Sequence, residues 1–160
     1  MNEIERKAKI LKAGSRLLYI WSGINFFLAA LILASVVIFK ANSPLLILVF
    51  DQSEIASLSA KVIASLNALT ILYNSCAVVL SVLVWMIIRK NMIVHQKWAF
   101  WVLLFVIGFV ELMSFIASVP IGNARWQLYA VQSVLYVVGI SLSGYAIFKA
   151  KKPTLADSQK

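Results

Sequence analysis

The chain has 160 residues, of which 62% are hydrophobic and 13% are charged, and its mean hydropathy is +0.90. Water-soluble domains contain about 45–50% apolar and about 25% charged residues, so this composition excludes an ordinary soluble domain. The formal net charge of +9 is explained by basic residues that face anionic lipid headgroups. Membrane lipids are therefore expected partners, and nucleic acid is not.

Four long segments lack Asp, Glu, Lys and Arg, with Glu111 as the single exception. Each segment exceeds the roughly 20 residues that an α-helix needs to cross about 30 Å of hydrocarbon. We therefore predict an all-α membrane protein, a four-helix transmembrane bundle formed by residues 17–148 between basic tails at 1–16 and 149–160. The predicted spans are 17–39, 62–88, 98–119 and 126–148.

The first apolar segment follows a basic run, which is also the pattern of a secretory signal peptide. Its apolar stretch is longer than a signal peptide uses, and residues 37–40 lack the small side chains of a cleavage site. We expect this segment to remain as a membrane anchor.

The basic residues predict the orientation of the spans. Of the 15 lysines and arginines, 12 lie in the two tails and in the loop between the second and third spans, and three lie on the opposite side. The positive-inside rule then places both termini in the cytoplasm, and the short loops favour a bacterial inner membrane. The tryptophans are expected at the membrane interfaces, where amphipathic rings are stable: Trp21, Trp85, Trp98, Trp101 and Trp126.

The first outer loop predicts a short interfacial segment. Ser43 and Pro44 form a helix-start pattern before residues 45–50, an apolar run too short to span a membrane. Asp51 and Glu54 then match a capping box, so the second span is expected to begin as an interfacial helix near Gln52. A cation site at these two carboxylates is the less favoured alternative, since no further oxygen ligands stand nearby.

Glu111 is the residue most suggestive of function, because it lies within the third span. Counted from Lys97, it is about 21 Å along the helix, in the outer half of the membrane. A charged carboxylate at this depth costs about 2.5–3.5 kcal/mol, and ionisable residues inside membranes generally mark functional sites. Contact with a ligand, proton or ion is weighed equally against a bridge to Asn74 and Gln132. An ion pair with Arg125 would weaken the functional interpretation.

Polar residues at similar depths on the other spans are expected to converge on Glu111. Hydrogen bonding between helices is the simpler explanation for each of them taken singly. Together they predict an outward-opening polar cavity, with Asn25 as its floor. The predicted ligand-binding residues are Glu111, Asn74, Gln132, Tyr136, Thr70 and Asn25.

The chain lacks a catalytic constellation, since its single His95, its single Cys76 and Glu111 lie at three different depths. We therefore predict no enzymatic activity, no cofactor and no metal site. The stretch from Arg89 to Trp101, especially His95 to Trp101, resembles the basic, Trp-Ala-aromatic opening of the third helix in small uncharacterised bacterial four-helix integral membrane proteins. This resemblance implies a topology and no particular activity.

Two functions follow from these patterns. The first is binding or transport of a small amphiphilic or cationic ligand in the cavity around Glu111, with or without coupling to protons. The alternative is a non-catalytic accessory or assembly subunit that docks on a larger membrane complex through its lipid-facing surface. A homo-oligomer is compatible with either function.

Overall fold

The computed structural model describes residues 3–38, 43, 46–47, 50–118 and 126–148. All regular elements among these residues are helical, and four of the helices are long and apolar enough to cross a membrane. The predicted all-helical fold with four long apolar helices is thus confirmed. These helices are α1 (Glu3–Leu33), α4 (Ala60–Ile87), α5 (Lys97–Ser118) and α6 (Trp126–Phe148).

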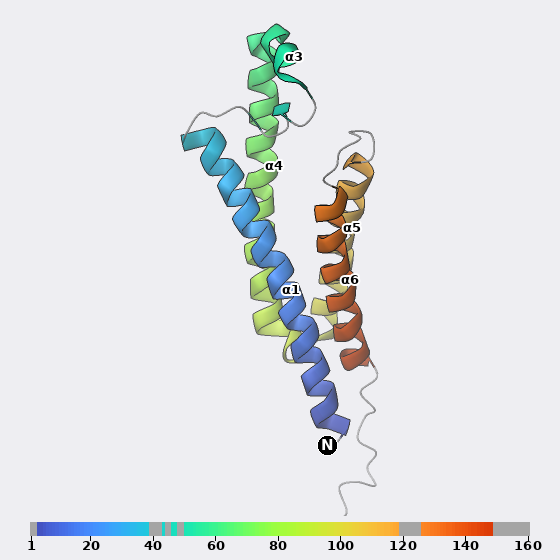
Figure 1. The fold of residues 1–160 in the computed structure, drawn as a ribbon. Coiled ribbons are helices and arrows are strands. Elements are labelled where there is room, and N and C mark those ends of the chain that lie inside the picture. The colour runs from blue at the N-terminus through green and yellow to red at the C-terminus, as the bar shows by residue number, and fades with distance from the viewer. Residues whose placement is uncertain (1–2, 39–42, 44–45, 48–49, 119–125, 149–160) are drawn as a thin grey trace, which may run out of the picture.

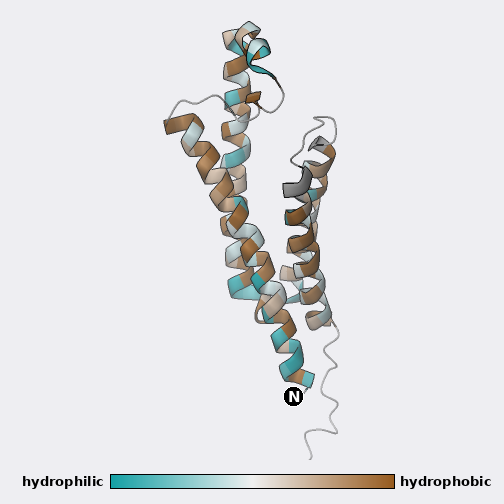
Figure 2. Cartoon of the chain, in the orientation of Figure 1, coloured by the Kyte–Doolittle hydropathy of each residue, from teal (hydrophilic) through white to brown (hydrophobic). Residues whose placement is uncertain are grey.

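The four long helices form an elongated bundle in which α1 packs against both α4 and α6 (Figure 1). The start of α1 and the end of α6 lie at one end, where α4 is also joined to α5. We call this the basic end, because it carries Arg89, Lys90, Lys97 and the basic first turns of α1. At the opposite end α4 extends beyond the other helices and carries the short helix α3 (Gln52–Ser57) (Figure 1). Figure 2 shows hydrophobic residues along most of α1, α5 and α6 and hydrophilic ones in the first turns of α1.

The ends of the helices agree with the predicted spans except at α1. π-Helical turns extend α1 over Ala34–Ile38 and α4 over Ile88–Met92. α1 begins at Glu3, so residues 3–16, predicted as a tail, form the first half of this helix, and Leu11 in this half is buried. Lysine and arginine are good helix formers, so a basic stretch can continue a helix beyond its apolar segment. The predicted tail at 149–160 lies outside the described residues, as do residues 119–125.

A close crossing of α1 and α6 depends on small residues. A Cβ atom added to Gly14 would lie 2.8 Å from the carbonyl oxygen of Gly139 and 2.9 Å from the backbone nitrogen of Ser143. Gly139 and Ser143 are four residues apart, a small-xxx-small spacing that lets two helix backbones approach. Gly14 therefore sets how closely α1 approaches α6.

The described part of the first loop is attached to α4. The Ser43 backbone N–H donates to Oδ1 of Asn67 at 3.0 Å, and the Ser43 hydroxyl contacts the hydroxyl of Thr70. Ser43 and Leu46 are fully buried. The expected interfacial segment is therefore packed on the protein at these two residues, whereas Pro44 lies outside the described residues.

The predicted capping box at the start of α3 is confirmed. The Asp51 carboxylate accepts a hydrogen bond from the Glu54 backbone N–H at 2.8 Å, and the Glu54 carboxylate accepts one from the Asp51 N–H at 2.9 Å. The second span does not begin in this helix, however, because Leu58 and Ser59 have extended backbones. Ser59 is the N-cap of α4, so a second capping side chain separates the two helices.

The capping box predicts a pH-dependent order in α3. Hydrogen bonds from the Ser53 hydroxyl and then from the Glu54 N–H hold the pKa of Asp51 below its ordinary value of 3.8. A lowered folded-state pKa means that this stabilisation is complete above the ordinary pKa and is lost as the pH falls through the lowered one. We expect the hydrogen-exchange protection of the Glu54 amide to be constant near neutral pH and to fall below about pH 4.

An Asp51→Ala variant should lower this protection severalfold near neutral pH and abolish its pH dependence, since alanine offers no acceptor for the cap. Ser57→Ala, at the other end of α3, is the matched control and should keep the pH dependence. An unchanged protection factor in Asp51→Ala would contradict the role of the cap.

Candidate functional site

The Glu111 carboxylate joins three helices. Its Oε1 accepts a hydrogen bond from Nε1 of Trp21 on α1, and its Oε2 accepts one from Oγ of Ser133 on α6, both at 2.8 Å. Among the described residues, no lysine or arginine forms an ion pair with it. Arg125 lies outside the described residues. Glu111 is therefore held in a fixed orientation by two neutral donors.

Trp21 is a core residue, with only 2% of its surface exposed. Its ring is therefore packed inside the bundle and does not face outward as expected for an interfacial tryptophan. Its indole ring lies 6.3 Å from the ring of Tyr136, measured between centroids, and its N–H points to Glu111. Trp85, Trp98 and Trp101 are exposed toward the basic end of the bundle. The side chain of Trp126 lies outside the described part of the chain.

Tyr136 packs next to Trp21, the residue that donates to Glu111. It is buried, and its hydroxyl donates to the backbone carbonyl of Leu104 at 2.8 Å. Its hydroxyl also lies against Gly108, one turn before Glu111 on α5, where an added Cβ would be 3.0 Å away. Tyr136 thus packs between Trp21 and α5 and does not line the groove described next.

A groove with a volume of about 570 Å³ passes beside Glu111. Its lining includes Asn25, Glu111 and Gln132, three of the six predicted ligand-binding residues. The outer parts of its walls are apolar and exposed, as at Val79 and Leu83 on α4 and Val106 on α5. The site is therefore a groove with largely apolar walls and a polar base, where a polar cavity was predicted.

Thr70 and Asn74 do not line this groove. The Thr70 hydroxyl contacts Ser43 and donates to the backbone carbonyl of Leu66, and the Asn74 amide donates to the carbonyl of Thr70. Both residues are buried. The predicted convergence of Thr70 and Asn74 on Glu111 is thus wrong, because Thr70 contacts the first loop and Asn74 bonds to its own helix.

Asn25 and Gln132 both line the groove, but their side chains have different surroundings. The Asn25 amide donates to the backbone carbonyl of Trp21 at 2.9 Å and is half-buried. Gln132 is 6% exposed and lies next to Ser133 on α6. Gln132 does not form the predicted bridge to Glu111, whose carboxylate accepts from Trp21 and Ser133.

Sequence reasoning missed several residues of this site. Trp21 and Ser133, the two donors to Glu111, are not among the predicted ligand-binding residues. Tyr73 on α4 and Ser114 on α5 also line the groove, and their hydroxyl oxygens are 3.5 Å apart. Ser114 lies three residues after Glu111, so its helical face was the available signal. The single cysteine, Cys76, is exposed in the same groove.

Comparisons of this chain with protein-family models, with curated proteins and with solved structures give no match. The function is therefore argued from the geometry of the groove.

Proposed function

We propose that the groove beside Glu111 binds a small amphiphilic cation within the membrane. The observation that carries the proposal is the carboxylate at its base, oriented by Trp21 and Ser133 without an ion pair among the described residues. A cationic group that reaches Glu111 would supply the missing counter-charge. Because electrostatic attraction is strong in a medium of low dielectric constant, one such contact can select a cation over a neutral molecule.

The walls of the groove suit the rest of such a ligand. Ligand sites of about 300–1,000 Å³ with mostly apolar walls and a few oriented polar groups are typical for small molecules, and this groove has about 570 Å³. An alkyl or aromatic tail would lie against Val79, Leu83 and Val106, while Asn25 and Gln132 offer amide groups near the carboxylate. This arrangement favours an amphiphile over a fully polar solute.

The proposal includes the orientation of the protein. The basic end carries the start of α1 and the connection between α4 and α5, which contains Arg89 and Lys90. Basic residues close to the ends of spans are retained on the cytoplasmic side. We therefore place the basic end and both termini in the cytoplasm, in a bacterial inner membrane.

Cys76 provides a direct assay, because it is the only cysteine of the chain and lines the groove. The full chain is reconstituted in liposomes, and the reaction of Cys76 with a lipid-soluble maleimide is followed by mass spectrometry. Dodecylammonium should slow this reaction severalfold, whereas the uncharged dodecanol should not. Glu111→Gln should raise the concentration of dodecylammonium needed for protection about tenfold, a typical effect of removing one charged partner.

Glutamine keeps the size of Glu111. Its amide oxygen can accept from Trp21 and its NH2 group can donate to the Ser133 hydroxyl, so the variant should fold. Glu54→Gln, which removes a carboxylate far from the groove in α3, is the matched control and should leave the protection unchanged. Equal protection of Cys76 in wild type and Glu111→Gln would overturn the proposed role of the carboxylate.

Transport is tested separately from binding. In liposomes with an imposed pH gradient, proton-coupled uptake of dodecylammonium should be lost in Glu111→Gln. Binding without any uptake in the wild type would assign the groove to binding alone. The accessory-subunit alternative predicts another result: intact Cys76 protection in Glu111→Gln, and loss of a co-purifying partner when the exposed Val131 and Val138 are replaced by tryptophan.

A further inference from the structure

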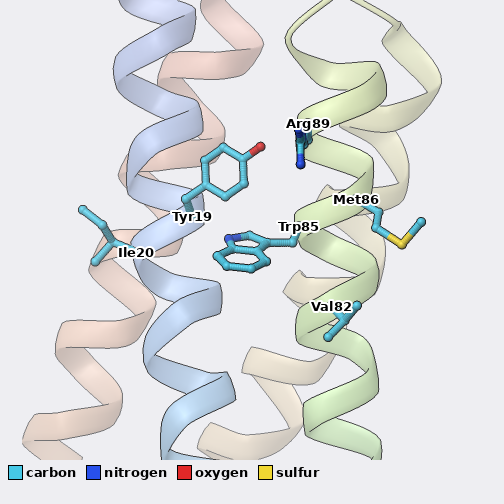
Figure 3. A pocket seen from close by; sticks show the side chains of 6 residues that line it. All are labelled: Tyr19, Ile20, Val82, Trp85, Met86 and Arg89. Atoms are coloured by element: carbon cyan, nitrogen blue, oxygen red, sulfur yellow. The ribbon is translucent and has the colours of Figure 1, made fainter.

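A second hollow lies on the outside of the bundle between α1 and α4, separate from the groove beside Glu111. It has a volume of about 440 Å³ and is lined by Tyr19, Ile20, Val82, Trp85, Met86 and Arg89. Figure 3 shows Trp85 reaching from α4 toward α1, with the Tyr19 hydroxyl directed toward Arg89. The hollow thus has a polar end at Arg89 and an apolar floor below it.

The lining of α4 is one continuous helix face. Val82, Trp85, Met86 and Arg89 follow one another at spacings of three, one and three residues, so they lie on the same side of α4. From Arg89 to Val82 this face runs for about 10 Å along the helix. Val82 and Met86 are exposed apolar side chains along it, and Ile20 is an exposed apolar side chain on α1. The guanidinium group of Arg89 therefore lies at one end of an open row of apolar side chains, which we call the apolar track.

A second arginine lies level with Arg89 on α1. The Ser22 hydroxyl donates to the Ser81 carbonyl at 2.8 Å, and the rings of Tyr19 and Trp85 are 6.2 Å apart, which fixes the antiparallel register of α1 and α4. Continuing this register one turn toward the basic end brings Arg16 to the level of Arg89. Arg16 shares its helix face with Tyr19, three residues later, and both arginines are exposed.

We propose that this hollow binds an anionic phospholipid, with its phosphate between Arg16 and Arg89 and one acyl chain on the track formed by Ile20, Val82 and Met86. The charge of the polar end is complementary to a phosphate, and among the described carboxylates none forms an ion pair with either arginine. Guanidinium groups bind phosphate with two parallel hydrogen bonds. Tyr19 and Trp85 supply the aromatic side chains that are stable at headgroup depth. The site is independent of Glu111.

The proposal is tested with the full chain by native mass spectrometry in detergent. Equal amounts of phosphatidylglycerol and phosphatidylcholine with the same acyl chains are added, and the retained lipid adducts are compared. The wild type should retain phosphatidylglycerol about 30-fold over phosphatidylcholine, because two basic contacts near a membrane surface contribute about 1 kcal/mol each. Arg89→Gln should lower this preference to about fivefold, the contribution of Arg16 alone, and Arg89→Lys should keep more of it.

Lys90→Gln is the matched control, because Lys90 is the neighbouring cation and does not line the hollow. It should retain the wild-type preference, and thermal unfolding should show that all variants fold alike. A large molar excess of inorganic phosphate should leave phosphatidylglycerol bound, because phosphate cannot use the apolar track. The proposal is overturned if the wild type shows no preference, if Lys90→Gln loses as much as Arg89→Gln, or if phosphate displaces the lipid.

Discussion

A Gly14→Ala variant should lose about 1–3 kcal/mol of its free energy of unfolding, the usual cost of forcing a methyl group into a packed site. The new Cβ would lie 2.5 Å from Oγ of Ser143 and 2.8 Å from the carbonyl oxygen of Gly139. The Ser143 side chain can rotate, but the Gly139 carbonyl belongs to the backbone of α6. α1 must therefore move away from α6, which also loosens the packing around Leu18.

Gly23, on the same helix, is the matched control. A Cβ added at Gly23 meets no atom within 4 Å. Gly23→Ala should be neutral or should stabilise the protein by up to about 1 kcal/mol, because alanine restricts the unfolded chain more than glycine does. The measurement is reversible unfolding of the full chain in mixed micelles of increasing denaturing detergent. Equal stabilities of the two variants would contradict the close crossing of α1 and α6.

Trp21→Phe should have the second large effect. It removes the N–H group that donates to Glu111 Oε1, and it leaves that partly buried oxygen without this partner. The loss of a hydrogen bond to an ionisable group costs about 1–3 kcal/mol, and the smaller ring also loses contact with Tyr136. Unfolding in mixed micelles measures the difference.

Trp98→Phe is the control for this change. The Trp98 indole also donates one hydrogen bond, to Gln96, but the residue is exposed, so its replacement should cost less than about 0.5 kcal/mol. A double-mutant cycle of Trp21→Phe with Glu111→Leu should give a coupling of about 1 kcal/mol, within the range measured for hydrogen bonds between membrane helices. Independent, additive effects would show that the two side chains do not interact.

The long helices were predictable from sequence because charge and hydropathy change sharply at their ends. α5 and α6 begin and end within one residue of the predicted spans. The start of α1 was not predictable in this way. The spans were predicted from segments without charged residues, and Gly14, where α1 crosses α6, lies within a basic stretch. The break between α3 and α4 depends on the competition between two N-caps, Asp51 and Ser59, which periodicity does not reveal.

The site was only partly predictable, because its prediction depended on counting depth from the ends of the spans. By that count Trp21 lies about 6 Å inside its span and Glu111 about 21 Å inside its own. Their hydrogen bond shows that α1 is displaced along the bundle relative to α5. The displacement follows from the contact of Gly14 with Gly139, and no local pattern in one helix encodes where another helix will cross it.

The exposed apolar side chains at the rim of the groove would determine the route by which the proposed ligand reaches Glu111. Val79, Leu83 and Val106 lie on the outer surfaces of the two helices that flank it, away from either end of the bundle. A molecule would therefore arrive sideways, after dissolving in the lipid phase. Its partition coefficient would then set its effective concentration at the protein, so occupancy should scale with mole fraction in the bilayer rather than with aqueous molarity.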